Sequence, residues 1–165
     1  LADVAPQLRV LDMSGTSNVD DEALGAATGL FELQLSDVDD VDGSCFGRMR
    51  RLRELSLQEM HGLTRACLAP LAGSLRLLDV DGSASLDDQE LGALTGLRRL
   101  SLYCCEGVSV DAVRRLPMLR HLNVTVLRKD RSAAAEGWRR LKGREGAAAL
   151  RADMPQLEDV RVFTQ

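Results

Sequence analysis

Leucine and other apolar residues recur along the chain in the pattern LxxLxL, in which Val or Met replaces Leu at some positions. The pattern occurs seven times, beginning at Leu8, Leu30, Leu52, Leu75, Leu97, Leu119 and Leu157. The first leucines are 22, 22, 23, 22, 22 and then 38 residues apart. A repeated unit of this length is typical of a solenoid, in which each unit buries its apolar edge only against its neighbours.

Within each unit, the alternation of apolar and polar residues predicts a short strand. The predicted strands span 8–14, 30–36, 52–58, 75–81, 97–103, 119–125 and 157–163. Because the units are equivalent, the strands are expected to form one parallel sheet. Antiparallel pairing or two separate cores would contradict this prediction.

Two further apolar columns predict a short helix between consecutive strands. They lie three residues apart, which is helical spacing, as in Leu24 with Ala27 and Leu91 with Leu94. Carboxylates stand just before these segments, where they can cap unpaired amides: Asp20-Asp21, Asp87-Asp88 and Asp111. The predicted fold class is α/β, a solenoid with a parallel concave sheet and short convex helices.

This pattern resembles the leucine-rich-repeat superfamily over residues 1–127 and 150–165. The units are most similar to the cysteine-containing and irregular repeats of ribonuclease-inhibitor-like and F-box-associated arrays, and to arrays common in flagellated protists. The resemblance implies a right-handed horseshoe or arc that acts as an interaction module. One column departs from the family, which often has Asn or Cys at the ninth repeat position. That column contains Thr16, Val38, Met60, Ser83, Cys105 and Leu127.

We expect one domain over residues 1–165, with about seven repeat strands and an insertion at 128–149. The chain begins inside a repeat, since Pro6 precedes Leu8 as Pro117 precedes Leu119. Solenoid ends normally need a polar cap. We therefore expect either upstream repeats or a partner that covers the N-terminal end.

The insertion at 128–149 is basic and contains the only Trp of the chain, Trp138. Ser132 is placed to cap a helix through Ala133–Ala135, with Ala134, Trp138 and Leu141 along one face. Three interpretations are open for this segment: a surface helix whose Trp138 caps the end of the solenoid, a contact with a protein partner, or a contact with nucleic acid or another anionic surface.

The residues between the leucines of each strand are expected to face the concave side. The richest patch there is Tyr103 beside Arg99 and His121, because Tyr and Arg are favoured at interfaces. The alternative is a solvated sheet face that binds nothing. The candidate protein-binding residues are Arg99, Tyr103, His121, Trp138, Arg139, Arg140 and Lys142.

Charge is divided along the chain. Residues 1–90 carry a net charge of −10 and residues 91–165 a net charge of +6, which gives −4 in total. Such a division orients partners but does not define a fold. The acidic front half argues against a general nucleic-acid binder, although the basic end alone is still compatible with RNA in a larger assembly.

No motif of a catalytic, cofactor or metal site is found. The acidic run from Asp37 to Asp42 lacks the Gly and Glu that a calcium-binding EF-hand loop needs, which favours a solvated turn. The four cysteines have no zinc-type spacing, and Cys105 fits the turn column of the repeat. We therefore expect no enzyme activity and no cofactor, and we expect reduced thiols in an intracellular compartment.

Three functions are compatible with these features. The preferred one is a non-catalytic protein-interaction or structural subunit of a larger complex. The alternatives are a ribonucleoprotein or organellar-assembly component whose basic insertion contacts RNA, and an F-box-type substrate-recognition module. The expected partners are proteins, with RNA as a second class; a small-molecule ligand and a membrane span are not expected. The expected location is cytoplasmic or organellar, including mitochondrial.

Overall fold

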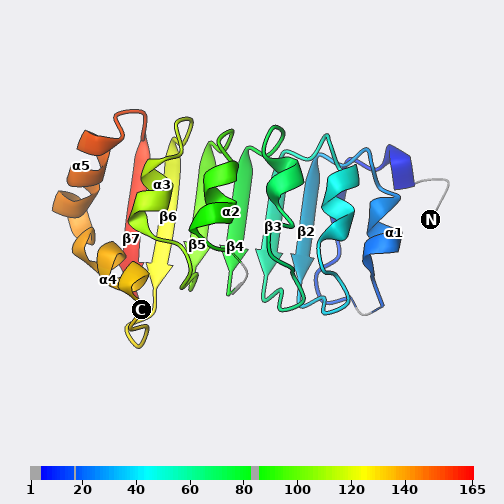
Figure 1. Cartoon of the computed structure of the whole chain (residues 1–165), viewed down its shortest axis with the longest axis horizontal. Coiled ribbons are helices and arrows are strands. Elements are labelled where there is room, and N and C mark those ends of the chain that lie inside the picture. The colour runs from blue at the N-terminus through cyan, green and yellow to red at the C-terminus, as the bar shows by residue number, and fades with distance from the viewer. Residues whose placement is uncertain (1–4, 17, 83–85) are drawn as a thin grey trace.

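The chain forms one sheet with helical segments along one of its faces (Figure 1). The computed structural model describes residues 5–16, 18–82 and 86–165. Within these residues, seven strands pair in the order of the sequence, and every neighbouring pair is parallel. The strands are β1 (Val10–Asp12), β2 (Glu32–Ser36), β3 (Glu54–Gln58), β4 (Leu77–Asp81), β5 (Arg99–Tyr103), β6 (His121–Val126) and β7 (Asp159–Thr164). The predicted parallel solenoid is confirmed.

The strands begin two residues later than predicted. The first leucine of each unit, such as Leu52, ends the preceding turn, where its amide is bonded to the Met49 carbonyl at 3.0 Å. The side chain of Leu52 is nevertheless fully buried. An apolar pattern shows that a leucine faces the core, but it does not show whether the backbone there is turn or strand.

The helical segments that link the strands are shorter than ordinary helices, since a 22-residue unit leaves little chain for the return path. Three are α-helical: α1 (Asp21–Gly25), α2 (Asp88–Ala93) and α3 (Val110–Arg114). Two are single 3₁₀ turns, η2 (Ser44–Arg48) and η3 (Ala69–Leu71), and a third, η1 (Ala5–Gln7), precedes β1. The predicted helical columns are confirmed as buried positions, but two of the units form 3₁₀ helix instead of α-helix.

Two of the three expected acidic caps are confirmed. Asp20 accepts a hydrogen bond from the Ala23 amide, and Asp87 accepts from the amides of Gln89 and Glu90. The expectation for Asp111 is wrong. Ser109 caps α3 through its hydroxyl, because Asp111 already lies in the first turn of that helix.

Carboxylates also connect neighbouring repeats, which the sequence did not predict. Asp21 accepts from the amides of Asp42 and Cys45, and Asp88 accepts from the Ser109 amide and hydroxyl. Although burial by itself raises the pKa of Asp21, the hydrogen bonds from Cys45 and Asp42 outweigh it, and the pKa lies below its ordinary value. Asp21 therefore contributes stability above its unfolded-state pKa, and that contribution is lost as the pH falls through the lowered pKa of the folded state.

Glu90 is a buried carboxylate that contacts the preceding repeat, whereas Asp21 and Asp88 contact the following one. Its Oε1 accepts a hydrogen bond of 2.8 Å from the buried Leu68 amide of the preceding repeat. Burial is the main cause that raises the pKa of Glu90. The ionised side chain therefore satisfies an amide at the cost of being removed from water.

We expect Glu90→Ala to lower the free energy of unfolding by about 1–3 kcal/mol, because the buried Leu68 amide then lacks an acceptor. Glu90→Gln keeps an acceptor oxygen and removes the buried charge, so its effect at pH 7 should be small. Since the folded-state pKa is raised, the wild type should gain stability relative to Glu90→Gln as the pH falls through that pKa. Urea unfolding at pH 7 and pH 5 measures both effects, and equal losses in the two variants at pH 7 would contradict this role.

The described residues of the ninth repeat column combine apolar packing with one hydroxyl and one thiol, and the Thr16 hydroxyl donates a hydrogen bond of 2.7 Å to the Met13 carbonyl. Val38 and Met60 are buried, and the Cys105 thiol lies 3.6 Å from the Val80 carbonyl and 3.5 Å from that of Tyr103. Cys105 thus bonds the turn backbone as predicted. Ser83 of this column lies outside the described residues.

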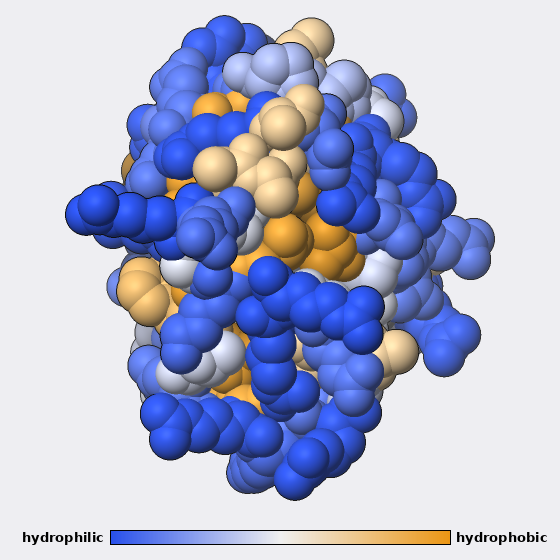
Figure 2. All heavy atoms as spheres, turned by 90° about the vertical axis from the view of Figure 1, so that its left-hand side faces the viewer, coloured by the Kyte–Doolittle hydropathy of each residue, from blue (hydrophilic) through white to orange (hydrophobic). Residues whose placement is uncertain are grey.

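The C-terminal end contains the long connection between β6 and β7. It forms α4 (Ala133–Arg140) and α5 (Gly143–Asp153), and α5 is followed directly by the turn into β7. Figure 2 shows this end of the molecule: hydrophilic side chains surround it, while hydrophobic ones remain visible at its centre. Phe163 on β7 is about half exposed. Among the described residues, no helix has both the length and the apolar character needed to cross a bilayer.

Candidate functional site

We call the sheet face opposite the helical segments the open face. It carries three columns of aligned side chains. Strand pairing keeps each column in register, as in Glu32–Glu54–Leu77–Arg99–His121–Asp159. The central column contains Asp12, Gln34, Ser56, Asp79, Ser101, Asn123 and Arg161, and the third contains Ser36, Gln58, Asp81, Tyr103, Thr125 and Phe163. The predicted alternation is confirmed, because the leucines between these residues are buried.

The open face over β1–β4 is acidic. Its charged residues are Asp12, Glu32, Glu54, Asp79 and Asp81, without a Lys or Arg among these strands. Burial, followed by the charges of Glu59 and Asp79, raises the pKa of Asp81. Burial is the main cause of this raised pKa, and the neighbouring carboxylates add to it because no cation on these strands balances them.

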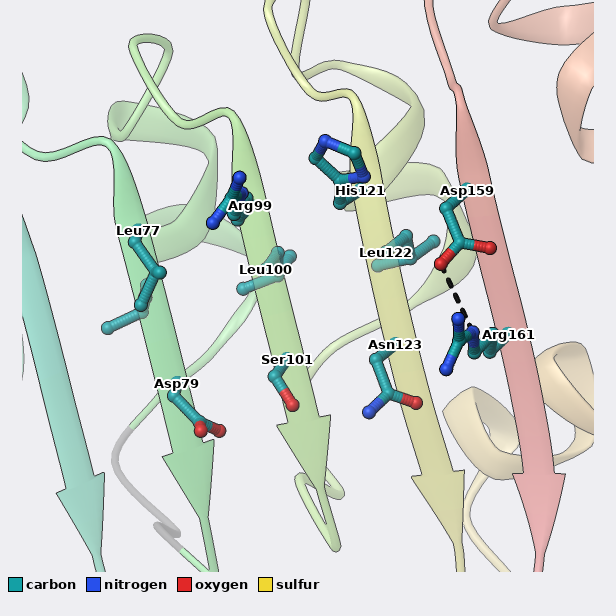
Figure 3. A pocket seen from close by; sticks show the side chains of 11 residues that line it. Leu77, Asp79, Arg99, Leu100, Ser101, His121, Leu122, Asn123, Asp159 and Arg161 are labelled. Atoms are coloured by element: carbon teal, nitrogen blue, oxygen red, sulfur yellow. Dashed lines mark ion pairs between the residues drawn. The ribbon is translucent and has the colours of Figure 1, made fainter.

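The open face over β4–β7 contains a shallow depression of about 280 Å³ (Figure 3). Two cations, Arg99 and Arg161, and two carboxylates, Asp79 and Asp159, line it together with His121. Figure 3 shows these side chains on four adjacent strands, with an ion pair of 3.1 Å between Arg161 and Asp159. The other lining residues are Leu77, Leu78, Leu100, Ser101, Leu122 and Asn123. Leu78, Leu100 and Leu122 are buried beneath the depression, so Leu77 is the only leucine of its lining that lies on the open face. Polar groups of both signs suit a peptide better than a purely apolar ligand.

Of the three predicted concave residues, the structure brings two together. Arg99 and His121 are register partners and both line the depression, whereas Tyr103 lies at the far end of β5 beside Asp81 and Thr125. The Tyr103 hydroxyl donates a hydrogen bond of 2.9 Å to Oε1 of Gln165. The patch therefore extends from Arg99 and His121 towards β7 and not towards Tyr103.

The His121 side chain lies close to the carboxylate of Glu158 at the rim of the depression. Its Nε2 lies 3.6 Å from Glu158, which also accepts a hydrogen bond of 2.5 Å from Arg120. His121 is thus a polar group at the edge of the patch, in contact with the Glu158 carboxylate.

The structure places Trp138 in the core instead of on the surface. Only 2% of the side chain is exposed, and its Nε1–H donates a hydrogen bond of 2.9 Å to the Val108 carbonyl. Ser132 caps α4 as predicted, but the buried face is Ala135 with Trp138, and Ala134 and Leu141 are only half-buried. An indole buried in this way is available for packing, not for a partner.

The three predicted cations of the insertion have different roles. Arg139 donates through Nη2 to the carbonyls of Leu127, Arg128 and Asp130, and so fixes the loop before α4. Arg140 and Lys142 are exposed. None of them lines the depression of the open face, so that only Arg99 and His121 of the seven predicted residues lie at it.

Four charged or apolar members of the depression were not predicted from the sequence as site residues: Leu77, Asp79, Asp159 and Arg161. Each stands in the same repeat column as a predicted residue or in the adjacent column. An alignment of the repeat columns in units four to seven would therefore have been sufficient to find these four residues.

The cysteines do not form a reactive site. All four are free thiols, and burial followed by the Glu90 charge raises the pKa of Cys67 to about 12. Burial likewise raises the pKa of Cys105 to about 12. Since the thiolate is the nucleophile and the metal ligand, these thiols are unreactive near neutral pH. In the described part of the chain, no three His, Cys, Asp or Glu residues are grouped so as to hold a metal ion.

Comparisons with known proteins support the fold. No protein-family model and no curated protein matches the sequence. Among solved structures, the chain is similar to an internalin of Listeria monocytogenes, with 17% identity over 99% of this chain and a TM-score of 0.61. The chain spans 44% of the length of that internalin. At this identity the likeness concerns the fold alone, which is an α/β leucine-rich-repeat solenoid.

Proposed function

We propose that the chain is a non-catalytic protein-interaction module that binds its partner across the open face of the sheet. The observation that carries this proposal is the division of charge on that face. Five carboxylates stand on β1–β4 without a cation, whereas the open face over β5–β7 carries Arg99, His121 and the Arg161–Asp159 ion pair. Complementary potentials steer encounter and fix the orientation of a partner.

The shape of the face also suits a protein. The helical segments lie on the other side of the sheet, so that the aligned columns are open to a partner (Figure 1). Leu77 offers partly exposed apolar contact at the depression, and Arg99 is the kind of residue that often anchors interfaces. An extended segment with a basic part over β1–β4 and an acidic residue near Arg99 would match the charges.

The alternatives of RNA contact and of an F-box-type module have no observation that favours them over this proposal. In the insertion, Trp138 is buried and Arg139 is bonded to backbone carbonyls. The exposed cations of the insertion are Arg128, Lys129 and Arg131 before α4, and Arg140, Lys142 and Arg144 from the end of α4 to the start of α5. The last three provide matched control positions for the experiments below.

Site-specific photo-crosslinking in the native cell extract tests the proposal. A photoreactive residue at the exposed Asn123 of β6 should give a discrete crosslinked protein, and one at the exposed Ala93 of α2 should not. Arg99→Glu should reduce the Asn123 crosslink at least tenfold, because it reverses the charge beside the depression, while Arg140→Glu should leave it unchanged. The same crosslink from Ala93, or an Asn123 crosslink insensitive to Arg99→Glu, would refute the open face as the binding surface.

A further inference from the structure

Four consecutive turns of the solenoid carry arginines and no acidic residue. They are the five residues before each of β3, β4, β5 and β6, namely 49–53, 72–76, 94–98 and 116–120. Because the strands are parallel, these turns lie side by side along one edge of the sheet (Figure 1). We call their arginines the arginine edge: Arg50, Arg51, Arg53, Arg76, Arg98 and Arg120.

Two of these arginines are held in place by uncharged acceptors. Arg53 donates to the Ser74 carbonyl at 3.1 Å, and Arg76 donates to the carbonyls of Leu75, Gly73 and Gly96 at 2.9, 3.3 and 3.5 Å. Each thus reaches the turn of the next repeat. Carbonyl partners orient a guanidinium but do not cancel its charge, so the edge remains positive.

The other arginines are exposed. In the described part of the chain, the side chains of Arg50, Arg51 and Arg98 make neither an ion pair nor a hydrogen bond that would occupy them. Arg120 pairs with Glu158 of the turn into β7, where the edge ends. A depression of about 420 Å³ lies on the edge, lined by Arg50 and Arg53 with Gly47, Pro70, Gly73 and Ser74.

We propose that the arginine edge is a second docking surface, which binds a short acidic segment of a partner protein. Neighbouring strands are about 4.8 Å apart, so four turns span about 15 Å. That is the length of about four to five extended residues. Arginine suits this partner because its guanidinium binds a carboxylate through two parallel hydrogen bonds.

The surroundings favour a short protein segment over a long polyanion. At the opposite ends of the strands, the turns after β2 and β3 are acidic, with Asp37, Asp39 and Asp40 after β2 and Glu59 after β3. They and the acidic half of the open face would repel a duplex or a charged bilayer that extended beyond the edge. The four turns of the edge also contain no aromatic residue on which a base could stack. Met118, 56% exposed in the turn before β6, offers apolar contact to residues that flank the acidic ones.

Fluorescence anisotropy with the folded chain tests this surface. The probe is a fluorescein-labelled peptide with five consecutive glutamates, and its matched peptide has five glutamines. Arg50→Glu, Arg51→Glu and Arg98→Glu together should weaken binding of the glutamate peptide at least tenfold. Neutralisation of the same three residues to Gln should weaken it by less. Arg140→Glu, Lys142→Glu and Arg144→Glu together make the same change in net charge and should alter binding less than twofold.

Several results would overturn the proposal. Equal weakening by the two triple charge reversals would show that only net charge matters. Equal binding of the glutamate and glutamine peptides would show that carboxylates are not recognised. Tighter binding of a five-nucleotide single-stranded DNA or of phosphatidylserine vesicles would assign the edge to another class of partner. None of these results bears on the open face, whose test uses different variants.

Discussion

Leu55→Asp is expected to lower the free energy of unfolding by about 3–5 kcal/mol, the range seen when a buried charge is left without a partner. Leu55 is fully buried in β3 and is the register partner of Leu33 and Leu78, which are fully buried as well. The new carboxylate would therefore enter a column of leucines with no cation or donor to receive it. Urea denaturation followed by circular dichroism measures the loss.

Ser56→Asp is the matched control, because Ser56 is the next residue of the same strand and faces the open side. Its carboxylate can stay hydrated, so the expected change is within about 1 kcal/mol. Solenoid repeats interact mainly with their neighbours, so the unfolding curve of Leu55→Asp should also broaden as repeats on its two sides separate. A similar loss in both variants would mean that β3 is not in the register described.

The repeat pattern was sufficient to predict the fold, because the same pattern of buried leucines occurs in all seven units. A leucine column that is buried in one unit must be buried in the next, and five intervals of 22 or 23 residues fixed the register of six strands. The sheet order, the parallel pairing and the open-face columns all follow from that register. β7 was predicted from its own LxxLxL pattern in spite of the longer interval.

The contacts between repeats were not predictable in the same way. Asp21, Asp88 and Glu90 are acidic residues at positions typical of helix caps or of the first helical turn. Their carboxylates nevertheless accept hydrogen bonds from amides or hydroxyls one repeat away. A single sequence shows which residues can accept a hydrogen bond, but not which neighbouring amide lacks a partner. The same limit applies to Arg139, a surface cation by pattern that is bonded to three carbonyls.

The sequence predicted only part of the charge distribution. Summing charge along the chain showed an acidic front and a basic end, and it attributed the positive charge to the insertion. The arginine edge runs across this division, because it takes one or more arginines from each of four repeats. Its signal was present in the residue after the first leucine of the unit, which is Arg at positions 9, 53, 76, 98 and 120.

The insertion makes the packing role of Trp138 hard to predict from the repeat pattern. In the other repeats, an apolar residue eleven positions after the first leucine is buried, as Val41 and Val108 are. Counting from Leu119 gives Asp130 at this place, which is half-buried and not part of the core. Trp138 of α4 packs against the preceding repeat and donates to Val108, the residue of that column in the neighbouring unit. The indole thus stands in for the missing apolar residue.

We therefore expect Trp138→Ala to destabilise the chain by about 3–5 kcal/mol, the range for removal of a large buried aromatic side chain. Trp138→Phe keeps most of the apolar volume but loses the hydrogen bond to the Val108 carbonyl, so a smaller loss of about 1–2 kcal/mol is expected. Because the indole is 2% exposed, partner binding per folded molecule should not change in either variant. Thermal and urea unfolding give the stabilities, and binding is measured on the folded fraction at low temperature.

Arg140→Ala on the same helix is the control, because this side chain is exposed and should change stability by less than about 0.5 kcal/mol. The order of stability, wild type and Arg140→Ala above Trp138→Phe above Trp138→Ala, distinguishes a packing residue from a contact residue. If Trp138 were a contact residue, Trp138→Ala would weaken partner binding at unchanged stability. That result would require α4 to leave the solenoid when the partner binds, since the bond to Val108 and the contact with a partner cannot both be made by one buried indole.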